Sequence, residues 1–125
     1  MPNLYLDANI LMEIIFQRNK AFSCLETMQT ADKIFTSSLS VHICMYYLEK
    51  DSPDLIADFQ EILGEIFILD LNSNILSQAF KNYDFEDYED CLQIETCLSG
   101  KITNFLTLDK KLAKNHKNLL NIVLL

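Results

Sequence analysis

The chain contains little glycine and little proline, two of each among its 125 residues. Because disordered segments are usually rich in such residues and poor in hydrophobic ones, a half-hydrophobic chain of this kind is expected to lack long disordered segments. None of its four cysteines forms a C-x-x-C pair, so neither a zinc knuckle nor a redox motif is indicated. No apolar run reaches the length of a membrane span, and the N-terminus enters a strand pattern at once. We therefore expect no signal peptide, no membrane partner and a reducing, cytoplasmic location.

Basic residues are also scarce. Ten Lys and Arg face eighteen Asp and Glu, which gives a net charge of −8. This balance argues against a protein that coats nucleic acid through a broad basic surface, but it leaves room for an enzyme that contacts a few phosphates. Four of the ten basic residues follow Asp109 closely, at Lys110, Lys111, Lys114 and Lys117. They indicate either a solvated helix face or local phosphate contacts.

Short segments with strand character alternate with helical periodicity along the whole chain. We expect strands at about 3–6, 34–37, 66–69, 103–106 and 121–124. We expect helices at about 10–17, 21–30, 41–49, 53–63, 72–83, 87–98 and 110–116. Ser52 should cap the fourth of these, which begins at Pro53. This alternation predicts an α/β fold with a parallel or mostly parallel five-stranded sheet between two layers of helices. No linker, repeat or low-complexity tract interrupts it, so we expect a single domain over residues 1–125.

Aspartates occupy three of the predicted junctions between elements. Asp7 ends the first strand, Asp109 ends the fourth, and Asp90 opens a helix, with Asp87 one turn before it. In a parallel α/β sheet these junctions lie at the carboxyl edge, where such folds build their sites. Two carboxylates about 5 Å apart repel each other by roughly 3 kcal/mol at an effective dielectric of about 20. Mg²⁺ or Mn²⁺, which prefers oxygen ligands, would remove that cost.

Each of these acids also has a simpler structural explanation, because Asp is a favoured N-cap. Asp7 would cap the first helix, Asp87 the helix that contains Asp90, and Asp109 the last helix. Taken singly, each position is better explained as a cap. Taken together, three acidic helix starts from three parts of the chain at one sheet edge favour a shared site.

Three motifs in this order resemble the PIN-domain nucleases. Residues 7–11 read Asp-Ala-Asn-Ile-Leu, residues 87–93 read Asp-Tyr-Glu-Asp-Cys-Leu-Gln, and residues 107–109 read Thr-Leu-Asp. The resemblance extends over essentially the whole chain. It implies a PIN-like α/β/α fold, with strand order 3-2-1-4-5, and a metal-dependent endoribonuclease that hydrolyses RNA phosphodiesters. Many small bacterial members of the family are VapC-type toxins silenced by an antitoxin peptide, so an antitoxin is a second expected partner.

The resemblance also implies roles for individual residues. The expected catalytic and metal-holding residues are Asp7, Asp90 and Asp109. The supporting residues are Asn9, Asp87 and Thr107. Thr107 or Ser38 would add a hydroxyl at the rim of the site, and His42 would reach the site from the helix after the second strand; Ser38 and His42 are the two weaker candidates. The alternatives for the weaker candidates are a turn or cap residue for the serine and a packing residue for the histidine.

The chain departs from the family pattern at one position. The family usually places a Glu early in the helix after the second strand, where this chain has Ile43, and Glu49 lies about two turns too late to replace it. A PIN-like domain that binds RNA or protein without cutting is therefore the main alternative. A receiver domain has a similar length and an acidic pocket at the same edge. It is disfavoured because the first strand ends in a single acid and no Lys follows the last strand. A homodimer is one arrangement that the sequence leaves open.

Overall fold

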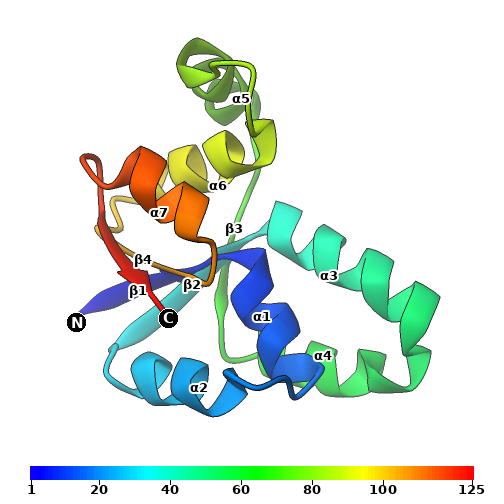
Figure 1. Ribbon diagram of the computed structural model, residues 1–125. Helices are drawn as coiled ribbons and strands as arrows, with labels where there is room; N and C mark the ends of the chain where they lie inside the picture. Colours follow the sequence, from blue (N-terminus) through cyan, green and yellow to red (C-terminus); the bar gives the residue numbers. More distant parts are fainter.

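The computed structural model describes all residues, 1–125, and places five parallel strands in one sheet (Figure 1). The strands are β1 (Asn3–Leu6), β2 (Lys33–Ser37), β3 (Phe67–Leu69), β4 (Asn104–Thr107) and β5 (Asn121–Leu124). Their order is β3-β2-β1-β4-β5, and every neighbouring pair is parallel. The predicted fold class and strand order are thus confirmed.

Seven α-helices and one short 3-10 helix connect the strands. They are α1 (Ala8–Ile15), α2 (Ala21–Gln29), α3 (Ser38–Asp51), η1 (Pro53–Leu55), α4 (Ile56–Leu63), α5 (Ser73–Asn82), α6 (Tyr88–Ser99) and α7 (Lys110–His116). The third of these begins three residues before the expected position 41, because the Ser37 side chain accepts the backbone N–H of Ser40 (2.9 Å) and caps it. Ser52 was expected to cap the next helix, but its side chain makes no capping bond and a 3-10 turn intervenes.

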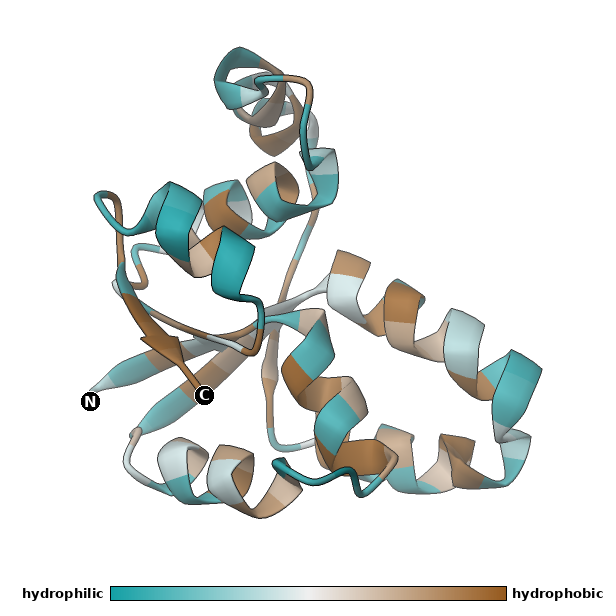
Figure 2. Cartoon of the chain, viewed as in Figure 1, coloured by the Kyte–Doolittle hydropathy of each residue, from teal (hydrophilic) through white to brown (hydrophobic).

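The central strand β1 has helices on both of its faces. Leu4 and Leu6 point to one face, where they belong to a core shared with α1, α2, α3 and α4. Tyr5 points to the other face and packs with residues of α6 and α7. This alternation is the period-2 pattern of a strand that is buried on both sides. In Figure 2, α7 is coloured mostly as hydrophilic, whereas β5 beside it is hydrophobic.

A third, smaller core holds α5 against α6. Its buried members are Ile75, Ala79, Cys91 and Leu92. In Figure 1, α5 lies beyond α6 and away from the sheet, so α6 is the layer that connects it to the rest of the molecule.

None of the helices is both long and apolar enough to cross a membrane.

Candidate active site

The three predicted acids lie at the same edge of the sheet. Asp7 and Asp109 follow β1 and β4, which are neighbours in the sheet with Leu6 paired to Leu106. Asp90 is the third residue of α6. The negative charges of Asp109 and Asp7 both raise the pKa of Asp90, so the three carboxyls are close enough to interact. The sheet order therefore brings together residues that lie 83 and 19 positions apart in the sequence.

The capping interpretation is also confirmed. Asp7 accepts the backbone N–H of Ala8 at the start of α1, and Asp87 accepts that of Asp90 at the start of α6. Asp109 Oδ1 accepts two backbone N–H groups at the start of α7, at 2.9 and 3.1 Å. Because capping occupies only part of each carboxylate, an aspartate that caps a helix keeps acceptor capacity for a second partner.

A compact hydrogen-bond network surrounds Asp7. Its Oδ2 accepts the hydroxyl of Thr107 (2.7 Å) and the side-chain amide of Asn9 (3.1 Å). The same threonine oxygen accepts the backbone N–H of Asp109 (3.0 Å). Thr107 is fully buried, so its hydroxyl lies beneath the acids and not at the rim, and it links Asp7 to Asp109. Asn9 also accepts the backbone N–H of Leu108 (3.2 Å), which ties α1 to the end of β4.

Burial dominates the protonation of Asp7. It raises the pKa of this carboxyl from 3.8 to about 6, although the bonds from Thr107 and Ala8 act in the opposite direction. The charges of Glu89 and Asp109 raise it further. Glu89 was not among the predicted site residues. Its position next to Asp90 at the start of α6 is the only signal in the sequence that could have found it.

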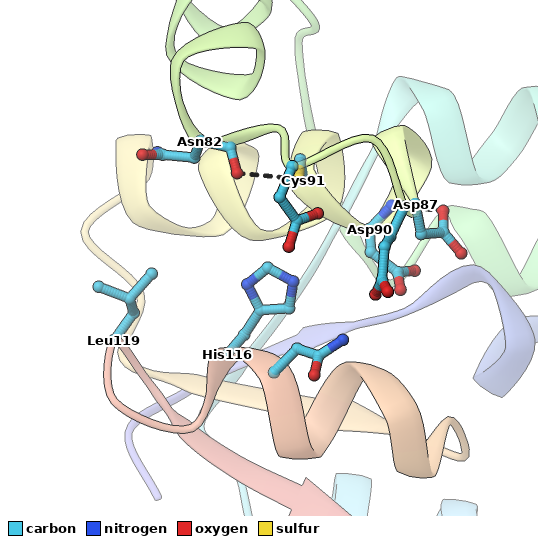
Figure 3. A pocket seen from close by; sticks show the side chains of 9 residues that line it. Asn82, Asp87, Asp90, Cys91, His116 and Leu119 are labelled. Carbon is cyan, nitrogen blue, oxygen red and sulfur yellow. Dashed lines mark hydrogen bonds between the residues drawn. The ribbon is translucent and has the colours of Figure 1, made fainter.

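Asp90 differs because no hydrogen bond reaches its carboxylate, although only 8% of the residue is exposed. Burial is the main cause that raises its pKa, followed by the charges of Asp87, Asp109, Asp7 and Glu89, and the value reaches about 8. Figure 3 shows Asp87 and Asp90 at one end of a cleft between α6 and α7, into which His116 points from α7; the volume of the cleft is about 230 Å³. Burial lowers the pKa of His116.

The carboxylates of Asp7, Asp90 and Asp109 are the kind of ligand that a hard divalent cation prefers. The acids offer oxygen ligands, and two of them carry raised pKa values, mainly because they are buried and further because other negative charges lie nearby. The side chains are not prearranged, since no three His, Cys, Asp or Glu residues stand in a metal-coordinating arrangement. Binding would therefore require a carboxylate to turn toward the others, and Asp90 is the one that no hydrogen bond restrains.

The two weaker candidates both lie on α3. Ser38 Oγ accepts the backbone N–H of Leu71 (3.2 Å), so it connects α3 to the segment after β3. His42 and Glu49 are exposed on α3. Ile43 is half-buried and lies in the second turn of α3, because this helix starts at Ser38. Neither Ser38 nor His42 contacts Asp7, Asp90 or Asp109 through a hydrogen bond.

The sequence analysis also missed a buried polar cluster beneath the site. Gln93, one turn after Asp90 on α6, accepts hydrogen bonds from the hydroxyls of Tyr5 and Ser37 and exchanges them with Ser40. All four residues are fully buried. The cluster fixes α6 against β1 and the start of α3, and so it sets where Asp90 stands relative to Asp7. The only sequence signal for this cluster was the side-chain amide of Gln93, which stands alone on the apolar face of a predicted helix.

Comparison with known proteins adds a family and a set of similar structures. A family model of the PIN domain matches residues 4–118. No curated protein is detectably similar in sequence. A toxin–antitoxin complex from Klebsiella pneumoniae contains a chain with a TM-score of 0.75 and 16% identity, covering 96% of this chain and 95% of that one.

Two further solved structures share the fold. VapC20 of Mycobacterium tuberculosis, a toxin that cleaves the sarcin–ricin loop, has a TM-score of 0.76 at 10% identity and covers 90% of this chain and 94% of its own. VapBC2 from Rickettsia felis, bound to a promoter DNA fragment, has a TM-score of 0.69 at 16% identity, with 98% and 97% covered. At such identities the likeness establishes the fold.

Proposed function

The chain belongs to the PIN-domain family, and on that premise we propose that it is a metal-dependent endoribonuclease. The observation that carries the proposal is the convergence of Asp7, Asp90 and Asp109 at one sheet edge, with the pKa of Asp90 raised by the charges of the other two. Buried like charges that have no basic partner are costly to maintain, and such perturbed groups cluster at functional sites.

The residues of the site have different parts in this proposal. Asp7, Asp90 and Asp109 would hold Mg²⁺ or Mn²⁺, and the bound ion would lower the pKa of a water and stabilise negative charge on the phosphate. Thr107 and Asn9 orient the Asp7 carboxylate through their hydrogen bonds. Asp87 positions the first turn of α6 by capping it. Glu89 adds negative charge next to Asp90.

The same proposal extends to partners and location. Several of the similar structures are toxin–antitoxin complexes, which supports a toxin whose activity an antitoxin protein suppresses. A homodimer is compatible with this arrangement. All four cysteines are free and buried, which supports a reducing, cytoplasmic location.

The main alternative is a PIN-like domain that binds RNA or protein and does not cut. The observation that favours it is Ile43, a hydrophobic residue where the family pattern has a carboxylate. A site with one acid fewer would hold a cation more weakly. Cleavage by the purified protein separates the two functions.

The decisive experiment measures cleavage of single-stranded RNA with Mn²⁺, with Mg²⁺ and with EDTA. We expect activity only with metal, and we expect Asp7→Asn, Asp90→Asn and Asp109→Asn each to reduce it by at least about 100-fold, because each removes a charge from the cation site. Asp32→Asn is the matched control, since Asp32 is exposed and precedes β2 at the opposite edge of the sheet. Cleavage that persists in EDTA or in Asp90→Asn would contradict the proposal.

A further inference from the structure

A second cleft lies beside the acidic edge, at the turn between α1 and α2. Its volume is about 480 Å³, and its lining residues are Glu13, Arg18, Asn19, Lys20 and Leu108. Leu108 joins this cleft to the candidate active site, because its backbone N–H donates to Asn9 Oδ1 and it directly precedes Asp109. The cleft therefore continues the site along α1.

The turn that forms this cleft is held by bonds of its own. The backbone N–H of Arg18 donates to the carbonyl of Glu13 (3.0 Å), and the backbone N–H of Lys20 donates to Glu13 Oε2 (2.7 Å). Gln17 adopts a positive φ of 52°, which is unfavourable for a residue other than glycine. These features fix the backbone of the turn in one shape, and Arg18 and Lys20, two positions apart in the sequence, both line the cleft.

Arg18 is the only arginine in the chain, and its guanidinium has no acidic partner. The one ion pair in the structure joins Lys111 to Glu86. The Arg18 guanidinium instead lies 5.0 Å from the centre of the Phe16 ring, and it belongs to an exposed residue. The carboxylate of Glu13 is engaged by the Lys20 backbone and is largely buried. In a protein with eighteen acids, the guanidinium is thus left free to bind an anion.

The Arg18 guanidinium is well suited to bind a phosphate group. A guanidinium presents a planar fork of N–H donors that binds phosphate oxygens in pairs, and an aromatic ring beneath it limits its motion. Lys20 adds a second positive charge at the same turn, although its Nζ already donates to the Leu125 carbonyl oxygen (3.0 Å). Arg18 is therefore the principal donor and Lys20 the supporting one.

We propose that Arg18, supported by Lys20, binds a second backbone phosphate of the RNA substrate, on the same strand as the phosphate at the acidic edge. The inference rests on the proposed function, because it needs a polynucleotide that lies across Asp7, Asp90 and Asp109. The eight residues of α1 rise roughly 12 Å from Asp7 to the turn, so the two phosphates are different ones. A local cation of this kind lets a strongly acidic protein hold a polyanion.

The test uses Arg18→Ala, Arg18→Lys and, as matched control, Lys50→Ala, which removes an exposed positive charge in the last turn of α3. Binding of a fluorescent single-stranded oligoribonucleotide is measured by anisotropy in EDTA at several salt concentrations. We expect Arg18→Ala to weaken binding about three- to tenfold and to reduce the slope of log affinity against log salt by about 0.7, the value for one phosphate on a single strand. Arg18→Lys should keep the slope and recover part of the affinity.

Cleavage kinetics in Mn²⁺ and a DNA control complete the design. Arg18→Ala should raise KM and leave kcat and the melting temperature unchanged, because the side chain is exposed and outside the acidic site. A single-stranded DNA of the same sequence should lose affinity equally, since the contact is with phosphate. Loss confined to RNA, or wild-type affinity and slope in Arg18→Ala, would overturn the inference.

The two proposals fail in different ways. Cleavage with no effect of Arg18→Ala refutes the phosphate site and leaves the nuclease standing. RNA binding that depends on Arg18 without any cleavage supports the phosphate site and refutes the nuclease. No RNA binding by the unaltered protein, together with no cleavage, refutes both.

Discussion

The two halves of the candidate site contain the same kind of residue in contrasting surroundings. On the β1–β4 half, Asp7 receives hydrogen bonds from a backbone N–H, a hydroxyl and an amide, and Asp109 receives two backbone N–H bonds. On the α6 half, the Asp90 carboxylate receives none and has the higher pKa, about 8. The first half is therefore preorganised, whereas the second stores unrelieved charge that only a proton or a cation can neutralise.

The largest expected effect is on stability as a function of pH, in EDTA. Raised pKa values mean that the folded protein keeps protons that the unfolded chain has lost, so these groups lower stability as pH rises above about 4. For Asp7 the loss is complete above its folded pKa of about 6 and amounts to about 3 kcal/mol. For Asp90 the loss of stability continues up to its folded pKa of about 8. Urea denaturation from pH 4.5 to 8.5 measures both stages.

The contrast between the two halves of the site would be wrong if the decline in stability between pH 6 and 8 did not come from Asp90. Asp90→Asn should remove the decline between pH 6 and 8 and, below pH 6, leave only the part of the decline that Asp7 causes. An unchanged decline in that variant would assign it to other groups.

The second effect is that Asp90→Asn stabilises the metal-free protein at pH 8 by several kcal/mol, since it removes a buried carboxyl whose pKa is raised from 3.8 to about 8. Asp7→Asn should gain less, because the new amide nitrogen would face the donors on Thr107 and Asn9. Thermal melting measures both variants. Millimolar Mn²⁺ should raise the melting temperature of the unaltered protein and not that of Asp90→Asn. If Asp90→Asn and Asp7→Asn raised the stability of the metal-free protein equally, the two halves of the site would not differ in this respect.

The third effect tests the preorganised half through Thr107. Thr107→Val removes the hydroxyl that joins Asp7 to Asp109, and it should cost about 1–2 kcal/mol of unfolding free energy because buried acceptors and donors lose their partner. Thr96→Val is the matched control, since that buried hydroxyl bonds only to a carbonyl of its own helix (2.7 Å). Chemical denaturation should show the larger loss for Thr107→Val, and Thr107→Ser should restore most of it.

The smallest effect concerns Ile43, which lies one turn after Leu39 and Ser40, the residues of α3 that pack toward α6. Ile43 belongs to none of the three buried cores. Ile43→Glu should therefore cost only about 1 kcal/mol without metal. It should tighten Mn²⁺ binding in calorimetry and raise the cleavage rate. A loss of several kcal/mol with no gain in Mn²⁺ affinity would show that Ile43 is a packing residue and would favour the non-catalytic function.

The sequence predicted the features that local chemistry determines. Alternating strands and helices, the caps at Asp7, Asp87 and Asp109, and the convergence of acids at one edge all follow from short-range pattern and the rules of parallel sheets. The Asp90 environment did not follow, because it depends on which groups from other elements surround the helix start.

The missed features involve partners far apart in the chain. Gln93 bonds to residues 53, 56 and 88 positions away, and Thr107 reaches Asp7 across 100 positions. Nothing in the sequence near Thr107 distinguishes a buried linking hydroxyl from one at the rim. The Ser52 cap was wrong for a local reason, since a 3-10 turn starting at Pro53 took the place of the expected helix start.

The small core between α5 and α6 has a consequence for how the molecule moves. These two helices share their own apolar contacts, and α5 lies outside the layers that bury the sheet. Units of this kind can open locally at a lower free energy than global unfolding requires. An excursion that detaches the start of α6 would carry Asp90 away, while Asp7 and Asp109 would stay at the ends of β1 and β4. The site can thus be assembled and dismantled by a small cooperative unit, and amide exchange in α5 and the first turn of α6 would be the earliest sign of it.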